Sequence, residues 1–536
     1  MISYRTPPSG SPNRIWDGPA DSLTADPEAV LARLKDLDRD FYLVSRGDQT
    51  AAAQAGEILP NTGKADGLSL LASAQPISPE QFGSPDFRET YGVRRAYMAG
   101  SMANAISSEE MVIAMGKAGY LASFGAGGVS PARLESAIQT IQAELPEGPS
   151  AFNLIHSPNE PVMEQKAVDL FRRYRVNTIE ASAFLRLTAP LVEYRASGLE
   201  PAPEGGVRIN HRVIGKLSRR EVARQFLQPA PEKLLQGLVD QGKITPLQAE
   251  LASRVPVADD LTVEADSGGH TDNRPLTSML PSLIALRDQL QAEHRFENPV
   301  RVGAAGGIGT PTSVLGAFSM GADYVVTGSI NQACREAGTS DRVKALLAEA
   351  AATDVMMAPA ADMFEMGVKV QVLKRGTMFP MRAQKLYDLY QEVESIEALD
   401  PQTRTDLEEK IFQRDLDQVW EDCVAFFEER DPDQLKKART NPRKKMALIY
   451  RWYLGLATYW GIQGAPERAF DYQIWCGPAM GAFNDWTAGT SLAEPRSRGV
   501  VEAADSLLAG AAYLTRLFDL KLQGVSVPPS WTRLLE

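Results

Sequence analysis

The sequence predicts an α/β protein whose main part is a (β/α)8 TIM barrel, with a helical insertion and a mostly helical C-terminal region. Two observations predict it. Across residues 91–385, short apolar runs alternate with helical patterns, which is typical of βαβ units with parallel strands. Eight such runs occur before residue 330, and this number favours a closed barrel over an open doubly wound sheet.

Residues 1–90 precede the barrel and are rich in Pro, Gly and Ser, which is typical of loops. They are interrupted by one amphipathic stretch, Pro27 to Leu37, and by one apolar run, Phe41 to Val44. We interpret this part of the chain as an arm or small subdomain that packs on something larger.

The predicted barrel strands are short runs rich in Val, Ile, Ala, Tyr and Phe. They are residues 96–99, 120–124, 151–155, 176–180 and 212–217, and the runs that begin at Thr262, Val300 and Asp323. Helices are predicted over 108–118, 131–145, 161–174 and 276–291, several of which open with Ser or Pro, the residues preferred at helix starts. Residues 218–255 are too long for a plain barrel loop, and we interpret them as a helical insertion on the catalytic face.

The C-terminal region, residues 386–536, has a mostly helical pattern. Long helices are predicted over 385–398, 406–430, 444–459 and 500–518. The region is interpreted either as a cap over the barrel mouth or as an oligomerisation unit, which would make the protein a homo-oligomer. Between its helices lies the segment 471–486, which contains Trp475, Phe483 and Trp486. These aromatic residues are typical of packing, and lining a substrate site is the alternative.

Composition excludes several classes of protein. The net charge of −12 over 536 residues argues against a nucleic-acid-binding protein, whose affinity depends on clustered Lys and Arg. Three scattered cysteines without C-x-x-C spacing argue against a disulfide framework or a thiolate metal site, and we expect no metal. The N-terminus lacks a signal-peptide pattern, and no run of ~18 apolar residues is present. We therefore expect a soluble, cytoplasmic protein that does not interact with membranes.

Three of the predicted strands end in glycine-containing breaks. The breaks contain Gly268 and Gly269, Gly306 and Gly307, and Gly328 and Ser329. Glycine allows backbone N–H groups to approach an anion without interference from a Cβ atom, and the start of a following helix favours negative charge. The last two breaks follow the seventh and eighth strands, where TIM-barrel enzymes most often bind phosphate. They therefore predict a phosphate site.

His270 directly follows the first of these glycine pairs. A histidine titrates near neutral pH and can donate a proton to a substrate carbon or a hydrogen bond to a carbonyl. His270 is therefore the candidate catalytic residue, with a structural role in its loop as the alternative. Asp272 and Arg274 are expected either to orient His270 or to pair with each other. His156 lies after the third strand, at the same mouth or on a surface loop.

Together these motifs resemble the nitronate monooxygenase-like flavoprotein barrels, and within them the PfaD branch of enoyl reductases from polyunsaturated fatty acid and polyketide synthases. The motifs are Ala99-Gly100-Ser101-Met102-Ala103-Asn104, Asn153, Glu264 to Pro275, Ala305-Gly306-Gly307-Ile308 and Tyr472 to Pro478. The resemblance covers roughly residues 90–520 and implies FMN at the barrel mouth, reduced by NAD(P)H, with NADPH favoured. FMN performs hydride chemistry itself, so the protein has to orient it and supply a proton.

The resemblance also implies roles for individual residues. Gly100, Ser101 and Met102 are expected beside the flavin ring, Asn153 within hydrogen-bonding reach of it, and Gly268 and Gly269 close to it. Gly306, Gly307, Gly328 and Ser329 are expected to hold the flavin phosphate. Lys216, near the end of the fifth strand, is expected either to place a positive charge beside the flavin or to form a structural ion pair.

Three functions remain open from the sequence. The first is an FMN-dependent enoyl reductase that acts on enoyl thioesters bound to acyl carrier protein domains. The second is a nitronate monooxygenase-type flavin oxidase, and the third a non-catalytic synthase scaffold. No carrier domain is recognisable in these 536 residues, so we expect action in trans. The basic run 436–445 contains Lys436, Lys437, Arg443, Lys444 and Lys445. It is either a solvated helix end or a docking surface for an acidic carrier.

Overall fold

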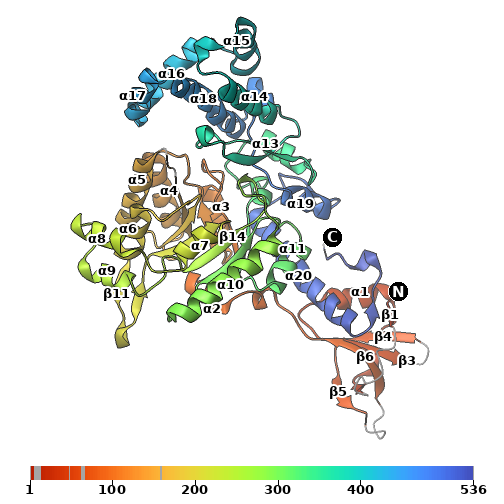
Figure 1. The fold of residues 1–536 in the computed structure, drawn as a ribbon. Coiled ribbons are helices and arrows are strands. Elements are labelled where there is room, and N and C mark those ends of the chain that lie inside the picture. The colour runs from red at the N-terminus through yellow and green to blue at the C-terminus, as the bar shows by residue number, and fades with distance from the viewer. Residues whose placement is uncertain are drawn as a thin grey trace. The chain divides into compact units, whose positions relative to one another are not determined.

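The fold is described from a computed structural model, which describes residues 2–4, 14–46, 49–61, 67–156, 158 and 160–534 (Figure 1). The chain divides into two compact units. The larger unit comprises Ser84–Gly309 and Met320–Val501, and the smaller one comprises Met1–Gly83, Thr310–Ser319 and Glu502–Glu536.

The larger unit contains a closed barrel of eight parallel strands, which confirms the predicted TIM-barrel fold. The strands are β7 (Tyr97–Ala99), β8 (Leu121–Phe124), β9 (Ala151–Ile155), β10 (Thr178–Ser182), β13 (Arg212–Leu217), β14 (Asp260–Glu264), β16 (Arg301–Ala305) and β17 (Val325–Thr327). They follow one another around the barrel in chain order, and β17 closes it by pairing with β7. Each lies within or next to a predicted run, because the buried apolar runs and their glycine ends define strands locally.

Helices precede, connect and follow these strands along the chain. They include α2 (Pro85–Tyr91), α3 (Glu109–Lys117), α4 (Pro131–Glu144), α5 (Pro161–Arg173), α6 (Ala189–Ser197), α10 (Leu276–His294), α12 (Ser329–Gln332) and α13 (Asp341–Ala348). The predicted caps are present at two of them. The Ser108 hydroxyl accepts a hydrogen bond from Met111 N at the start of α3, and the Ser130 hydroxyl accepts one from Arg133 N at the start of α4.

The segment 218–255 forms three helices, α7 (Arg220–Phe226), α8 (Glu232–Asp240) and α9 (Pro246–Ala252). Helices α8 and α9 pack against α6, and α7 packs against α10 and β13. The segment supplies none of the residues that line the cavity described below. Its helices therefore lie on the flank of the barrel, which corrects the prediction that they lie on the catalytic face.

After β17 the chain leaves the barrel, although the predicted barrel region extended to residue 385. A three-stranded antiparallel sheet joins β15 (Gly269–His270), β19 (Lys369–Leu373) and β18 (Val355–Pro359). Trp475 adds a bridge to Val372 on β19. This sheet ties the loop that carries His270 to a hairpin about a hundred residues later in the chain, a pairing that no local sequence pattern encodes.

The helical region that follows has a core of its own. It contains α14 (Phe379–Glu392), α15 (Pro401–Leu407), a π-helical turn (Glu408–Phe412), α16 (Leu416–Arg430), α17 (Pro432–Thr440), α18 (Pro442–Gln463) and α19 (Ala479–Thr487). Helix α18 packs against α14, α16 and α17. It brings Met446, Tyr450 and Leu454 into a buried cluster with Leu386 and Leu416.

The smaller unit is built on a five-stranded sheet, where the sequence indicated a loop-rich arm or small subdomain. Its strands are β2 (Arg14–Asp17), β3 (Phe41–Arg46), β4 (Gln49–Ala53), β5 (Glu57–Pro60) and β6 (Leu68–Ala74), in the order β4-β3-β6-β2-β5. Helices α1 (Pro27–Lys35), α11 (Pro311–Ser319) and α20 (Val500–Leu522) lie wholly or largely in this unit. Two short strands, β1 (Ser3–Tyr4) and β20 (Val525–Ser526), pair near its ends.

Helix α20 therefore does not belong with the other C-terminal helices. Its residues Tyr513, Leu517 and Leu520 share a buried cluster with Phe41 and Leu43 of β3. Arg516 of the same helix is buried, and its guanidinium donates hydrogen bonds to five backbone carbonyls. The acceptors are Leu34, Asp36, Leu37, Arg39 and Gln75, at 2.6–3.3 Å.

Among the described residues, none of the helices combines the length and the apolar character that crossing a bilayer requires.

Candidate active site

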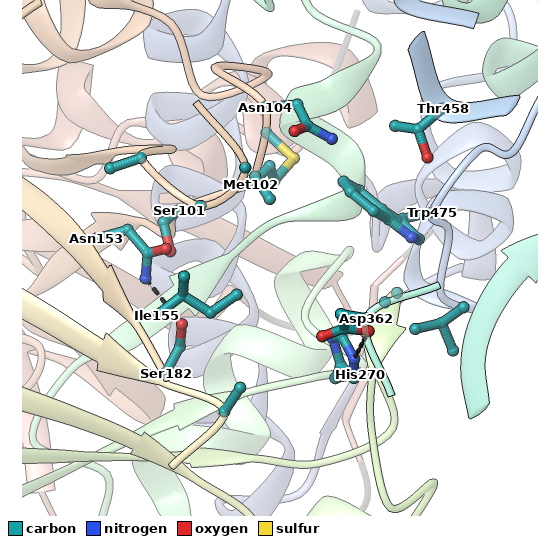
Figure 2. Close-up of a pocket in the computed structure, with 18 of the residues that line it drawn as sticks. Ser101, Met102, Asn104, Asn153, Ile155, Ser182, His270, Asp362, Thr458 and Trp475 are labelled. Carbon is teal, nitrogen blue, oxygen red and sulfur yellow. Dashed lines mark hydrogen bonds and ion pairs between the residues drawn. The ribbon is translucent and has the colours of Figure 1, made fainter. Parts of the chain in front are cut away.

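A cavity of about 610 Å³ opens at the C-terminal ends of the barrel strands in the larger unit. This volume lies within the range of small-molecule sites, roughly 300–1,000 Å³. All eight barrel strands or the loops directly after them supply lining residues. The twelve predicted site residues all line it: Gly100, Ser101, Met102, Asn153, Lys216, Gly268, Gly269, His270, Gly306, Gly307, Gly328 and Ser329. Figure 2 shows several of them with their neighbours.

Glycines border open space in the loops after β16 and β17. A Cβ atom added at Gly307 or at Gly328 would meet no heavy atom within 4 Å. Gly306 and Gly307 have φ values of +84° and +74°, a left-handed conformation that glycine adopts without strain. At Gly306 an added Cβ would also lie 2.6 Å from the carbonyl carbon of Ala265. The two loops thus present bare backbone to the cavity, as a phosphate cradle requires.

The loop after β7 is held in a strained conformation. Asn104 and Ala105, both without the freedom of glycine, have φ values of +57°. Their N–H groups donate to the carbonyls of Gly127 and Gly125, at 2.7 and 2.9 Å. Ala183, after β10, also has a positive φ, and both Asn104 and Ala183 line the cavity. Such backbone strain is commonly found at functional sites.

Asn153 is oriented by two hydrogen bonds from its amide nitrogen. Nδ2 donates to the Glu180 carbonyl at 3.0 Å and to the Ser182 hydroxyl at 2.8 Å, the second of which is drawn in Figure 2. Both amide hydrogens are therefore used within the barrel. The side-chain oxygen is left as the group with which Asn153 can accept a hydrogen bond from a ligand.

Three charged side chains form a cluster at the ends of neighbouring strands. Lys216 Nζ lies 3.6 Å from Glu180 Oε1 and 3.8 Å from Glu264 Oε1. Burial alone would lower the pKa of Lys216, but the two carboxylates outweigh it and raise the pKa, so the ammonium stays charged. The second oxygen of Glu180 accepts a hydrogen bond from Ser101 N at 2.8 Å. Lys216 thus forms the structural ion pair that was one of its two predicted roles, while still lining the cavity.

His270 is paired with Asp362, a residue that the sequence analysis did not identify. His270 Nε2 lies 3.1 Å from Asp362 Oδ1 (Figure 2). Burial alone would lower the pKa of His270, but the carboxylates of Asp362 and Glu264 outweigh it, and the pKa is raised. The pKa of Asp362 is lowered because His270 stabilises its charge more than burial disfavours it. Each group of the pair therefore favours the charged form of the other, the imidazolium of His270 and the carboxylate of Asp362.

The predicted partners of His270 lie elsewhere. Asp272 accepts hydrogen bonds from the Arg219 guanidinium at 3.0 and 3.1 Å and from the Ser218 hydroxyl at 2.5 Å. It therefore pairs with neither Arg274 nor His270, which corrects both expectations for Asp272. His156 is buried, and its Nδ1 lies 2.9 Å from Glu164 Oε2. It does not line the cavity, which excludes it from the site.

The segment 473–477 passes directly over the glycine pair before His270. A Cβ atom added at Gly268 would lie 2.8 Å from Cys476 N, and one added at Gly477 would lie 2.9 Å from Gly268 N. Gly477 N also donates to the Ser329 hydroxyl at 2.9 Å. This close approach places Trp475 at the cavity, whereas Phe483 is fully buried and Trp486 does not line the cavity. Of the three aromatic residues, only Trp475 has the alternative role of lining the site.

Helices α16 and α18 line the outer part of the cavity. Arg430 of α16 donates two hydrogen bonds, at 2.9 and 2.8 Å, to the carboxylate of Glu160, which precedes α5. Arg451 of α18 donates to the Ala361 carbonyl at 2.9 Å, next to Asp362. The helical region thus completes the site, which favours a cap over an oligomerisation unit.

The basic run 436–445 is largely engaged within the protein. The ammonium groups of Lys444 and Lys445 pair with Glu365 and Glu397, and the Arg443 guanidinium lies 4.7 Å from the centre of the Tyr390 ring. Lys436 and Lys437 are exposed on α17, and Lys436 pairs with Asp433 at 2.7 Å. Within the run, the solvent-exposed basic side chains therefore lie in its first half.

Comparisons with known proteins show similarity over most of the chain. The sequence profile described as "Fatty acid synthase subunit PfaD N-terminal domain" matches residues 16–76, and the profile of the "[Acyl-carrier-protein] S-malonyltransferase, inserted helical domain" matches residues 393–472. The crystal structure of the enoyl reductase domain of MlnA, from the macrolactin biosynthesis cluster of Bacillus amyloliquefaciens, is 39% identical. Its superposition has a TM-score of 0.78 and covers 82% of this chain and 99% of that domain.

The chain belongs to the PfaD-type enoyl reductase family. Two similar proteins are longer than this chain. One of the polyunsaturated fatty acid synthase subunits of Thraustochytrium sp. is 46% identical over 97% of this chain and 34% of its own length. The polyketide biosynthesis protein PksE of Bacillus subtilis is 46% identical over 82% of this chain and 57% of its own length. This chain thus spans between about a third and somewhat over half of these two relatives.

The PfaD-type assignment confirms the resemblance predicted from the glycine and histidine motifs. It makes the chain an enoyl reductase-like domain of the kind found in polyunsaturated fatty acid and polyketide synthase systems.

Proposed function

We propose that this protein is an FMN-dependent, NAD(P)H-consuming enoyl reductase that acts in trans on enoyl thioesters carried by acyl carrier protein domains. The observation that carries the proposal is the single cavity that joins the glycine loops after β16 and β17 to the His270–Asp362 pair. A phosphate cradle and a protonated imidazole in one cavity are what a flavin reductase needs. The family membership supports the reaction type.

The residues around the cavity fit a flavin mononucleotide. The open backbone at Gly307 and Gly328 leaves room for a phosphate. The free side-chain oxygen of Asn153 suits a ring N–H group, and Gly100, Ser101 and Met102 border the same space, with Gly268 and Gly269 on the side of His270. When bound, FMN reduced by NAD(P)H supplies the hydride for the β-carbon of the enoyl group.

His270 is proposed to deliver the proton to the α-carbon. Its raised pKa extends the protonated state to higher pH, and Asp362 fixes one ring nitrogen, so that the ring has a defined orientation in the cavity. Lys216 is proposed to act through its ion pairs, because it holds the Glu180 carboxylate that in turn fixes Ser101 N. In this proposal, Lys216 and Glu180 hold the loop after β7 in place, and His270 supplies the proton.

An anaerobic assay tests the proposal. Purified protein is expected to be yellow, and to oxidise NADPH when a trans-2-enoyl thioester of a free acyl carrier protein is added. Nitroalkane oxidation under air without enoyl reduction would replace the proposal with a nitronate monooxygenase-type activity. Colourless protein that binds no added FMN would leave only the scaffold function.

A further inference from the structure

The outer part of the cavity is an apolar chamber between α5 and the helices α16 and α18. Its apolar lining residues are Leu134, Met163, Phe426, Phe427, Trp452 and Leu456. Leu134 and Met163 come from α4 and α5 of the barrel, and the other four come from α16 and α18 of the helical region. The chamber belongs to the same cavity as His270, so a substrate that reacts there can extend into it.

Two aromatic side chains of this chamber are exposed, although Leu134 and Phe427 are buried. Phe426 is 37% exposed and Tyr459, which also lines the cavity, is 54% exposed. The Phe426 and Trp452 rings contact each other edge to face, with centres 5.3 Å apart. Clustered exposed aromatic and aliphatic groups typically mark a site for an apolar ligand.

Gly455 keeps the chamber open. It lies in the middle of α18, three residues after Trp452 and four before Tyr459, and so on the same helix face. A Cβ atom added there would meet nothing within 4 Å. Glycine inside a helix destabilises it by roughly 1 kcal/mol relative to alanine, so its presence needs a reason. The absence of a side chain at this position enlarges the space beside Phe426 and Trp452.

We propose that this chamber binds the alkyl chain of the enoyl thioester and that Gly455 sets the chain length it accepts. The inference rests on the proposed enoyl reductase function and extends it to substrate selection. The pantetheine arm suits the chamber less, because its amides need hydrogen-bond partners. The Glu160 and Arg430 side chains at the chamber edge are already bonded to each other.

Gly455→Leu tests the inference, with N-acetylcysteamine thioesters of crotonic acid and of trans-2-dodecenoic acid as substrates. Each methylene removed from water favours binding by roughly fourfold. Filling the chamber should therefore lower kcat/KM for the dodecenoyl ester by about tenfold or more, because several methylenes lose their site. The value for the crotonyl ester should stay within about twofold, because so short a chain does not reach the chamber.

Gly237→Leu is the matched control. Gly237 is also inside a helix, α8, and also has open space around a built Cβ atom, but it does not line the cavity. Both variants should keep the wild-type flavin spectrum and a melting temperature no lower than that of the wild type, which excludes misfolding.

Unchanged dodecenoyl reduction in Gly455→Leu would overturn the inference. An equal loss on both esters would also overturn it, because the chamber would then hold the thiol arm. If the wild-type protein reduces neither ester nor the carrier-bound substrate, the proposed function itself fails, and that result is distinct from either of these outcomes.

Discussion

At the scale of single residues, His270 depends on a partner from a distant part of the chain. The groups that face its ring are Asp362 and Glu264, which raise its pKa, and Lys216, which lowers it. The charge of Arg451, which donates a hydrogen bond to the neighbouring Ala361 carbonyl, also lowers the pKa of Asp362. Because the raised pKa extends the protonated state to higher pH, proton donation should fail only as pH rises through that pKa.

Asp362→Asn tests this coupling. The substitution removes the carboxylate that raises the pKa of His270 while burial, which lowers it, remains. The descending alkaline limb of the kcat/KM profile for enoyl reduction should therefore move to lower pH. His270→Ala should abolish that limb and lower enoyl reduction by roughly 10²–10⁴-fold, while FMN binding and reduction by NADPH persist. A wild-type pH profile in Asp362→Asn would show that Asp362 has only a structural role.

Gly307→Val tests the phosphate loop. A valine side chain would occupy the open space of the cavity and should give folded but colourless protein. Because φ at Gly307 is +74°, the backbone strain has to be separated from the loss of space. Gly242→Val provides this control, since φ at Gly242 is +67°, its surroundings are open and it lies outside the cavity. The control variant should retain FMN, and full flavin occupancy in Gly307→Val would contradict the predicted loop.

Residue types and glycine spacing predicted the glycine loops and His270, whereas Gly100, Ser101, Met102 and Asn153 came from the resemblance to a known family. Gly268 and His270 follow β14 within six residues and Gly306 follows β16 directly. Parallel strands bring their ends to one rim, and all twelve predicted residues line one cavity. Asp362 was missed because it reaches His270 only through the antiparallel β15–β19–β18 sheet. Glu180 was also missed, although the sequence indicated it. A carboxylate within a buried strand commonly has a charged or hydrogen-bonded partner.

At the scale of elements, helix α17 carries the solvent-exposed lysines of the basic run. Lys444 and Lys445 hold Glu365 and Glu397, so reversing their charge should destabilise the helical region instead of testing docking. Charge reversal of Lys436 and Lys437 is the informative change. Their side chains are exposed, and exposed charges act mainly on the rate of encounter with an acidic partner.

The double variant Lys436→Glu/Lys437→Glu should have a lower kcat/KM for a carrier-bound substrate. Its kcat/KM for a small thioester should be unchanged. The wild-type preference for the carrier-bound substrate should decline as salt is raised, because charges are screened over ~8–10 Å at ordinary ionic strength. Lys444→Glu is the comparison, and it should lower the melting temperature. If the double variant reduces both substrates at the wild-type rate, α17 is a solvated helix end.

The strands of the two units differ in how well the sequence predicts them. The eight barrel strands could be predicted because each is a compact apolar run that ends at a turn signal. The strands β2 to β6 were not predicted, because Pro, Gly and Ser are interspersed among them. They also pair in antiparallel fashion with partners that their composition does not indicate.

At the scale of the whole molecule, the smaller unit joins segments that are distant in sequence. Helix α20 packs on the sheet of residues 14–74, although its apolar pattern alone specifies no partner. Because the pattern specifies no partner, α20 was predicted to belong with the other helices of the C-terminal region.

Arg516→Met should destabilise the smaller unit, because five carbonyls lose their shared donor. We expect a loss of at least about 3 kcal/mol in the unfolding free energy of this unit, given the cost of buried carbonyls without partners. Hydrogen exchange of residues 14–74 should accelerate, while that of the barrel strands stays unchanged. Lys521→Met, an exposed position on the same helix, should have no such effect. Uniform acceleration throughout the chain would contradict a local role.

The pairing of α20 with the early sheet has a consequence for synthesis on the ribosome. Phe41 and Leu43 leave the exit tunnel long before Tyr513 and Leu517, which cover them in the finished unit. Translation of the intervening residues 84–501 takes roughly 20–80 s at ordinary elongation rates. For that interval the nascent sheet presents an uncovered apolar face while the barrel behind it can already close. A ribosome that stalls before α20 should therefore release a chain with a folded barrel that chaperones bind at its N-terminal sheet.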